Sequence, residues 1–238
     1  HAMRLVGPGN AQAIVATGPV LPGTWPYAQA LVPLAYDPER AASQLDAAGW
    51  QVPVGAVEGS PEYIRSSEDL PLAFTLVHAD DETHTAVAQA LREYWGHIGV
   101  VATLKAVPAE ALLTDYLEPR EFEAVLTDLD LTRYPDPDPY PFWHDSQAEA
   151  GQNYSGFSDR NTSIWLEQAR TTPDLTTRSE LYRSFQYRFQ DQMPSLFLYH
   201  PVYTTAVSAQ MQGVTLGPMV DPSDRFGGIA GWYVLARR

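Results

Sequence analysis

The chain has 238 residues, and none of them is cysteine. This absence excludes disulfide bonds, thiolate metal sites and cysteine nucleophiles. Basic residues are scarce as well, because 15 Lys and Arg stand against 29 Asp and Glu, giving a formal net charge of −14. So acidic a chain is unsuited to sequence-independent binding of nucleic acid or to docking on anionic membranes. No apolar run approaches the roughly 20 residues needed to span a bilayer, so direct membrane insertion is not expected.

The composition is that of a folded chain. Hydrophobic residues make up 45% of the sequence and charged residues 18%, which is typical of globular rather than disordered proteins. There are 20 prolines, and aromatic residues account for 11%. Proline fixes φ and aromatic rings offer stacking surface, so segments that combine them are candidates for a rigid binding surface. Residues 1–3 (HAM) are interpreted as a cloning remnant, and the chain is expected to be a piece of something longer.

Helix and strand signals alternate between residues 37 and 207. A helix is predicted from the N-cap Asp37, with Pro38 in its first turn, to Gly49. The elements expected after it are a strand at 72–78, a helix at 82–98, a strand at 100–107, a short helix at 108–117, a strand at 122–131, helices at 160–171 and 174–192, and a strand-like run at 195–207. This order predicts an α/β fold with a mixed or parallel sheet flanked by helices.

The densest unusual segment follows the last strand of that predicted sheet. Residues 133–144 read RYPDPDPYPFWH, and proline at every second position excludes a helix and predicts a stiff, extended path. Ligands of open α/β sheets bind beyond the carboxyl ends of the strands. Tyr134, Trp143 and Tyr154 are therefore candidates for ligand stacking, whereas the alternative is that Phe142 and Trp143 fill the core.

Several stretches of this sequence resemble one known family. The matching stretches are residues 134–137 (YPDP), 36–50 (YDPERAASQLDAAGW), 89–100 (QALREYWGHIGV), 153–158 (NYSGFS) and 178–186 (RSELYRSFQ). In this order they resemble motifs of the family 5 extracellular solute-binding proteins, the dipeptide- and oligopeptide-binding receptors of ABC importers. The resemblance extends from about residue 17 to the end of the chain.

The resemblance implies a fold, a function and a location. Members of that family are two-lobed, non-enzymatic bacterial receptors outside the cytoplasmic membrane that close around a solute and pass it to an ABC permease. The chain is similar to their C-terminal lobe, a periplasmic binding protein-like II lobe, which predicts an extracytoplasmic, lipid-anchored full-length protein. On this view residues 4–36 cross the hinge, residues 37–207 form the lobe, and residues 208–238 return toward a missing N-terminal lobe.

The proline- and aromatic-rich segment and the resemblance together predict a set of ligand-binding residues. The predicted set is Arg133, Tyr134, Asp136, Trp143, Asn153 and Tyr154. One position departs from the family pattern, because Arg133 stands where peptide-binding relatives carry an acidic residue that receives the ligand's α-amino group. An arginine repels an ammonium and attracts a carboxylate or phosphate. Asp136 could compensate, so anionic, sugar-like or C-terminally recognised peptide ligands remain open alternatives.

Enzymatic alternatives are weaker. Asp128 with Asp130, or Asp136 with Asp138, could in principle serve a small glycosidase, but close Asp pairs are expected by chance in so acidic a chain. The six histidines are scattered without metal-ligand spacing, and no nucleophile elbow, P-loop or dinucleotide-binding motif is present. We therefore expect no enzyme activity, no metal and no cofactor. A carbohydrate receptor of the same fold and a protein-interaction module remain as further alternatives.

Overall fold

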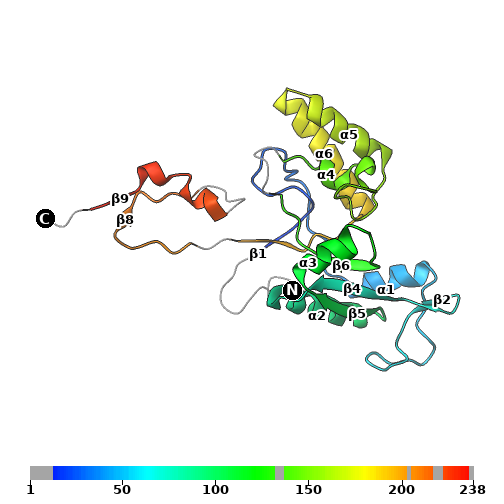
Figure 1. Cartoon of the computed structure of the whole chain (residues 1–238). Helices are drawn as coiled ribbons and strands as arrows, with labels where there is room; N and C mark the ends of the chain where they lie inside the picture. Colours follow the sequence, from blue (N-terminus) through cyan, green and yellow to red (C-terminus); the bar gives the residue numbers. More distant parts are fainter. Residues whose placement is uncertain (1–12, 132–136, 203–204, 217–221, 236–238) are drawn as a thin grey trace. The chain divides into compact units, whose positions relative to one another are not determined.

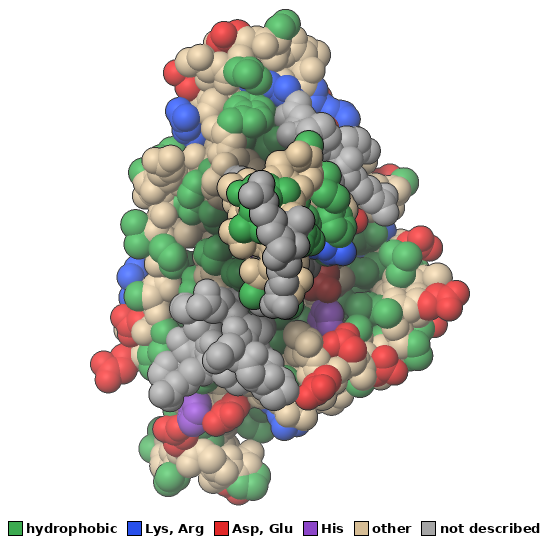
Figure 2. Space-filling view, turned by 90° about the vertical axis from the view of Figure 1, so that its left-hand side faces the viewer, with side chains coloured by type: hydrophobic (Ala, Val, Ile, Leu, Met, Phe, Trp, Pro, Cys, Tyr) green, Lys and Arg blue, Asp and Glu red, His purple; other side chains and the backbone are tan. Residues whose placement is uncertain are grey.

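The computed structural model describes residues 13–131, 137–202, 205–216 and 222–235. The chain divides into two compact units (Figure 1). The first unit comprises Leu34–Asp128, and the second comprises residues 13–33 together with the described residues from Leu129 onward. The sequence-based boundaries at 36/37 and 207/208 stay predictions. Many acidic side chains lie on the face drawn in Figure 2, in keeping with the net charge of −14.

The first unit is built on a three-stranded parallel sheet. Its strands are β4 (Ala73–Ala79), β5 (Val101–Val107) and β6 (Ala124–Leu126), in the order β5-β4-β6. Helix α2 (Glu82–Gly96) links β4 to β5 and buries Val87, Ala88 and Ala90. The predicted β-α-β-α-β order is confirmed, and β6 is shorter than the strand expected at 122–131.

Smaller elements complete the first unit. They are α1 (Pro38–Ala47), the two-stranded pair β2 (Ser66–Ser67) and β3 (Leu70–Pro71), α3 (Ala109–Ala111) and the π-helical turn η2 (Leu112–Leu117). Helix α1 begins as predicted, because the Asp37 carboxylate accepts a hydrogen bond from the Arg40 amide at 2.9 Å. Between α1 and β2 an irregular segment, cyan in Figure 1, runs out from the sheet and returns to it.

The second unit is built on two long helices that pack against each other. These are α5 (Arg160–Thr171) and α6 (Leu175–Gln192), close to the predicted ranges. They enclose an aromatic core made of Trp143, Leu166, Ala169, Tyr182, Phe185 and Phe189. Each of these helices begins at an aspartate that caps it, Asp159 for α5 and Asp174 for α6.

The remaining segments of the second unit contain only short elements. Strand β1 (Ala13–Val15) pairs antiparallel with β7 (Tyr199–Pro201), and β8 (Met211–Gln212) pairs with β9 (Tyr233–Val234). Two 3₁₀ turns, η4 (Pro222–Phe226) and η5 (Ile229–Gly231), lie between β8 and β9. None of the helices in the described ranges combines the length and apolar character that crossing a membrane would require.

A buried glutamine attaches the N-terminal segment to α6. Gln186 is almost fully buried, and its amide nitrogen donates to the carbonyls of Pro26 and Tyr182 at 2.8 and 2.9 Å. Its amide oxygen accepts from the Ala28 amide at 3.1 Å. The irregular segment therefore has a defined place on α6, which its Gly- and Pro-rich sequence alone did not indicate.

We expect Gln186→Met to lower the free energy of unfolding by about 2 kcal/mol, because it leaves buried backbone groups at Pro26 and Ala28 without partners. Urea denaturation of both proteins measures the difference. Gln190→Met is the matched control, since Gln190 makes one exposed bond from the same helix to the Val32 carbonyl. A control variant as destabilised as Gln186→Met would contradict this account.

Candidate functional site

The predicted ligand-binding segment is described only in part. Arg133, Tyr134 and Asp136 lie outside the described residues. Trp143, Asn153 and Tyr154 lie within them, in the segment that joins the sheet of the first unit to α5 of the second. These three residues have different surroundings, which distinguish side chains that shape the segment from those that reach its surface.

Asn153 holds the segment together from inside. Its side chain is fully buried, and its amide nitrogen donates to the carbonyls of His144 and Phe157 at 3.1 and 2.8 Å. Its amide oxygen accepts from the Phe157 amide at 3.1 Å and from the Ser155 hydroxyl at 3.0 Å. With both donors and its acceptor engaged, Asn153 fixes the path of residues 144–157.

Trp143 is part of the aromatic core. Its ring is 4% exposed and meets the ring of Phe189 edge-on, with the ring centres 4.6 Å apart. Phe197 lies on another side, at 5.9 Å. The indole nitrogen is buried and has no hydrogen-bond partner among the residues that the structure describes. Tyr154, by contrast, is partly exposed, and the turn that carries it continues through Gly156 at φ +65°.

The proline-rich segment is not extended throughout. Residues Tyr140–Trp143 form a single helical turn, α4, followed by the 3₁₀ turn η3 (Asp145–Gln147). The expectation that the prolines exclude a helix is wrong for this turn. Pro141 lies in its first turn, where the amide hydrogen that proline lacks would have no intrahelical acceptor.

That helical turn brings the Tyr140 ring close to a histidine and to an arginine. The Tyr140 ring stacks on the His144 imidazole, with ring centres 4.1 Å apart, and the Arg170 guanidinium lies 4.1 Å from its centre. Arg170 also pairs with Asp138 at 2.9 Å. The sequence reasoning missed this arrangement. The i, i+4 spacing of Tyr140 and His144 would have indicated the contact between their rings only if a helix had been expected there.

An ion pair joins the start of α5 to α6. The Asp159 carboxylate accepts hydrogen bonds from Nε and Nη2 of Arg188, at 3.0 and 2.8 Å, and caps α5 at the Thr162 amide. Burial opposes ionisation of Asp159, but the bonds from Arg188 and Thr162 outweigh it and hold its pKa below the ordinary value. The pair therefore stabilises the fold when Asp159 is ionised.

The Asp159 pair predicts a dependence of stability on pH. Because the pKa is lower in the folded protein, the stabilisation is complete above the unfolded value of about 3.9 and is lost as the pH falls through the folded value. We expect Asp159→Asn to be less stable than the wild type at pH 7, with the difference shrinking toward pH 3. Thermal denaturation at several pH values measures this. Asp191→Asn, which removes an exposed partner of the same arginine, serves as control, and an equal, pH-independent loss would contradict the prediction.

Two carboxylates of the glycosidase alternative have charged or titratable partners in the part that the structure describes. Asp128 follows the end of β6 and lies 3.5 Å from Nε2 of His84, and Asp138 is paired with Arg170. No group of three or more His, Cys, Asp or Glu within the described ranges could hold a metal ion. Asp136 lies outside those ranges.

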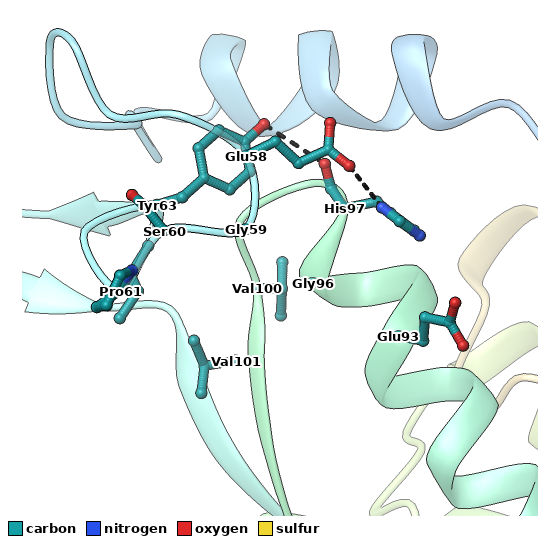
Figure 3. A pocket seen from close by; sticks show the side chains of 11 residues that line it. Glu58, Gly59, Ser60, Pro61, Tyr63, Glu93, Gly96, His97, Val100 and Val101 are labelled. Atoms are coloured by element: carbon teal, nitrogen blue, oxygen red, sulfur yellow. Dashed lines mark hydrogen bonds and ion pairs between the residues drawn. The ribbon is translucent and has the colours of Figure 1, made fainter.

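The first unit contains a hollow that the sequence did not reveal. It has a volume of about 580 Å³ and lies between the irregular segment after α1, the end of α2 and the start of β5 (Figure 3). Its lining consists of Glu58, Gly59, Ser60, Pro61, Tyr63, Ile64, Glu93, Gly96, His97, Val100 and Val101. The Glu58 carboxylate pairs with Nδ1 of His97 at 2.5 Å, and the Tyr63 hydroxyl donates to the His97 carbonyl at 3.4 Å. Residues more than 30 positions apart thus meet there.

Comparison with known proteins places the chain in a family. The family model described as "Bacterial extracellular solute-binding proteins, family 5 Middle" matches residues 9–152, more than half of the chain. Oligopeptide-binding protein AppA of Bacillus subtilis (strain 168) is 25% identical over 211 residues, which cover 87% of this chain and 37% of AppA. The chain thus spans little more than a third of the length of this curated relative.

Solved structures agree on the fold. AppA from Bacillus subtilis in complex with a nonapeptide has a TM-score of 0.73 at 22% identity, covering 94% of this chain and 43% of that one. NikZ from Campylobacter jejuni in complex with Ni(L-His) has a TM-score of 0.70 at 23% identity, covering 92% and 43%. These likenesses confirm the predicted fold class, and the family match supplies the assignment. The chain belongs to the bacterial extracellular solute-binding proteins of family 5.

Proposed function

We propose that this chain forms the C-terminal lobe, with its hinge crossings, of a receptor that binds peptides or peptide-sized solutes between two lobes. The receptor is a non-enzymatic, extracytoplasmic and lipid-anchored protein that passes its ligand to an ABC permease. The observation that carries the proposal is the family match over residues 9–152. The share of AppA that the chain spans, 37%, supports a lobe rather than a whole receptor.

Peptides are the ligand class that the relatives favour. Two of the similar curated proteins are named for binding oligopeptides and di- or tripeptides, each 25% identical to this chain. The fold by itself does not choose the ligand, because its neighbours include a protein bound to a nonapeptide and one bound to a nickel–histidine complex. We therefore rest the choice of peptide on the curated relatives and on the chemistry of the binding segment.

The residues proposed to serve binding fall into two groups. Trp143 and Asn153 shape the binding segment from within, which follows from their burial and bonding. Tyr154 contacts the ligand from the partly exposed turn. Arg133, Tyr134 and Asp136 are proposed as ligand contacts on the sequence resemblance, with Arg133 favouring a carboxylate of the ligand.

Calorimetry on the whole receptor, produced from the complete gene, tests the proposal. We expect a tetrapeptide library to contain ligands with dissociation constants of about 1 μM or lower. Tyr154→Ala should weaken the binding of these ligands about tenfold. Ser158→Ala, a substitution in the same segment, is the control. Binding of cello- or xylo-oligosaccharides with no binding of peptides would contradict the peptide assignment in favour of the carbohydrate alternative.

The 238-residue chain alone should bind the tetrapeptide ligands of the whole receptor too weakly to measure. A ligand held between two lobes loses about half of its contacts when one lobe is absent, and closure can no longer stabilise the complex. The same tetrapeptides are titrated into the chain and into the whole receptor. Micromolar binding by the chain alone would contradict the inter-lobe site.

A further inference from the structure

The hollow in the first unit has an apolar floor and an acidic rim. Val100 and Val101 at the start of β5 line it from below, and Pro61 and Ile64 line it from the irregular segment. Glu58 and Glu93 lie on the lining as well, while no Lys or Arg does (Figure 3). The lining therefore presents carboxylates beside apolar side chains.

Other residues of the same irregular segment are also acidic or apolar. Glu62 lies in the same segment, is exposed and adds a further carboxylate. Val54 and Val57, a few residues earlier, are largely exposed. Exposed apolar side chains thus lie close in sequence to those that line the hollow.

The walls of the hollow have fixed positions. The Glu58–His97 pair and the Tyr63–His97 hydrogen bond hold the segment to the end of α2 (Figure 3). At the base of the segment, the Arg65 amide donates to the Gly99 carbonyl at 2.8 Å, and the Arg65 guanidinium binds the Ile98 carbonyl at 2.6 Å. A preformed surface of this kind loses little conformational entropy on binding.

From this geometry we infer that the hollow is a docking groove for a segment of a partner protein that presents an arginine or lysine beside an apolar side chain. The carboxylates of Glu58 and Glu93 receive the cation, and Val100, Val101 and Pro61 receive the apolar side chain. The charge complementarity selects the partner's chemistry. All of the lining residues belong to the first unit, whereas the described residues of the proposed ligand-binding segment belong to the second.

Fluorescence anisotropy with a defined probe tests the inference. The probe is a labelled, terminally blocked hexapeptide of alternating arginine and leucine, and its control replaces each arginine by uncharged citrulline. We expect the wild-type chain to bind the arginine probe about tenfold more tightly than the citrulline probe, and raised salt to weaken that binding. Tyr154→Ala should leave it unchanged, which separates the groove from the proposed peptide site.

Three variants of the chain locate the binding. Glu58→Gln with Glu93→Gln should weaken the arginine probe about tenfold, while Glu110→Gln with Glu118→Gln, which removes two exposed carboxylates outside the groove, should not. Gly96→Lys should abolish binding, because a side chain at residue 96 meets no atom within 4 Å of its Cβ and extends from the lining.

Three results would overturn the inference. The first is no binding of the arginine probe at about 1 mM. The second is equal weakening by the two double variants, which would assign the effect to the net charge of −14. The third is a concentration-dependent dimer in sedimentation that Gly96→Lys abolishes, which would make a second copy of the chain the occupant.

Discussion

Replacement of Asn153 by aspartate should lower the free energy of unfolding by about 3 kcal/mol. In the wild type the side-chain amide donates to two carbonyls, those of His144 and Phe157, in a fully buried position. An ionised carboxylate at this place has no hydrogen to donate and turns a negative oxygen toward both carbonyl oxygens. Urea denaturation followed by tryptophan fluorescence measures the loss, since Trp143 lies in the core that unfolding exposes.

Ser155→Ala is the matched control for Asn153→Asp. The Ser155 hydroxyl contacts the same side-chain amide but is exposed, so its loss should cost less than about 1 kcal/mol. In the whole receptor, Asn153→Asp should also weaken ligand binding, because residues 144–157 lose their fixed path. If Asn153→Asp is as stable as Ser155→Ala, Asn153 does not hold the segment together.

Replacement of Arg65 by methionine should destabilise the first unit by about 3 kcal/mol. The Arg65 side chain is buried, and its Nη1 binds the Asp46 carboxylate and the Trp50 carbonyl, while Nε binds the Ile98 carbonyl. Methionine retains the apolar stem and leaves both carbonyls without a donor. Because Arg65 joins the end of α1 to the turn before β5, the loss should also loosen the walls of the proposed groove.

Asp46→Asn separates the ion pair from the backbone bonds of Arg65. Asp46 is half exposed, and asparagine retains an acceptor oxygen, so this variant should lose less than about 1 kcal/mol. Urea denaturation of the two variants gives the comparison. A loss in Asp46→Asn equal to that in Arg65→Met would show that the charge pair, rather than the buried carbonyls, carries the stabilisation.

Much of the candidate site was out of reach of sequence reasoning. The aromatic segment marked Trp143 and a family motif marked Asn153 as candidates for ligand binding, but the sequence does not show which way these side chains face. That direction depends on the packing of α5 and α6, which bury the indole in the aromatic core. The groove was missed for a similar reason, since Glu58 and His97 are 39 residues apart and nothing in the sequence indicates that they meet.

Short-range interactions made the helices and strands predictable from the sequence. Aspartates cap α1, α2, α5 and α6, and the apolar spacing marks the buried face of α2, because capping and periodicity act within one or two turns. The sequence likewise contains the acidic composition and the order of the motifs, and that order predicted the family. Only the tertiary structure decided what long-range packing controls. It placed Gln186 on Pro26, Arg65 on Ile98 and Trp143 in the core, because burial and hydrogen bonding across distant segments exist only once the chain has folded.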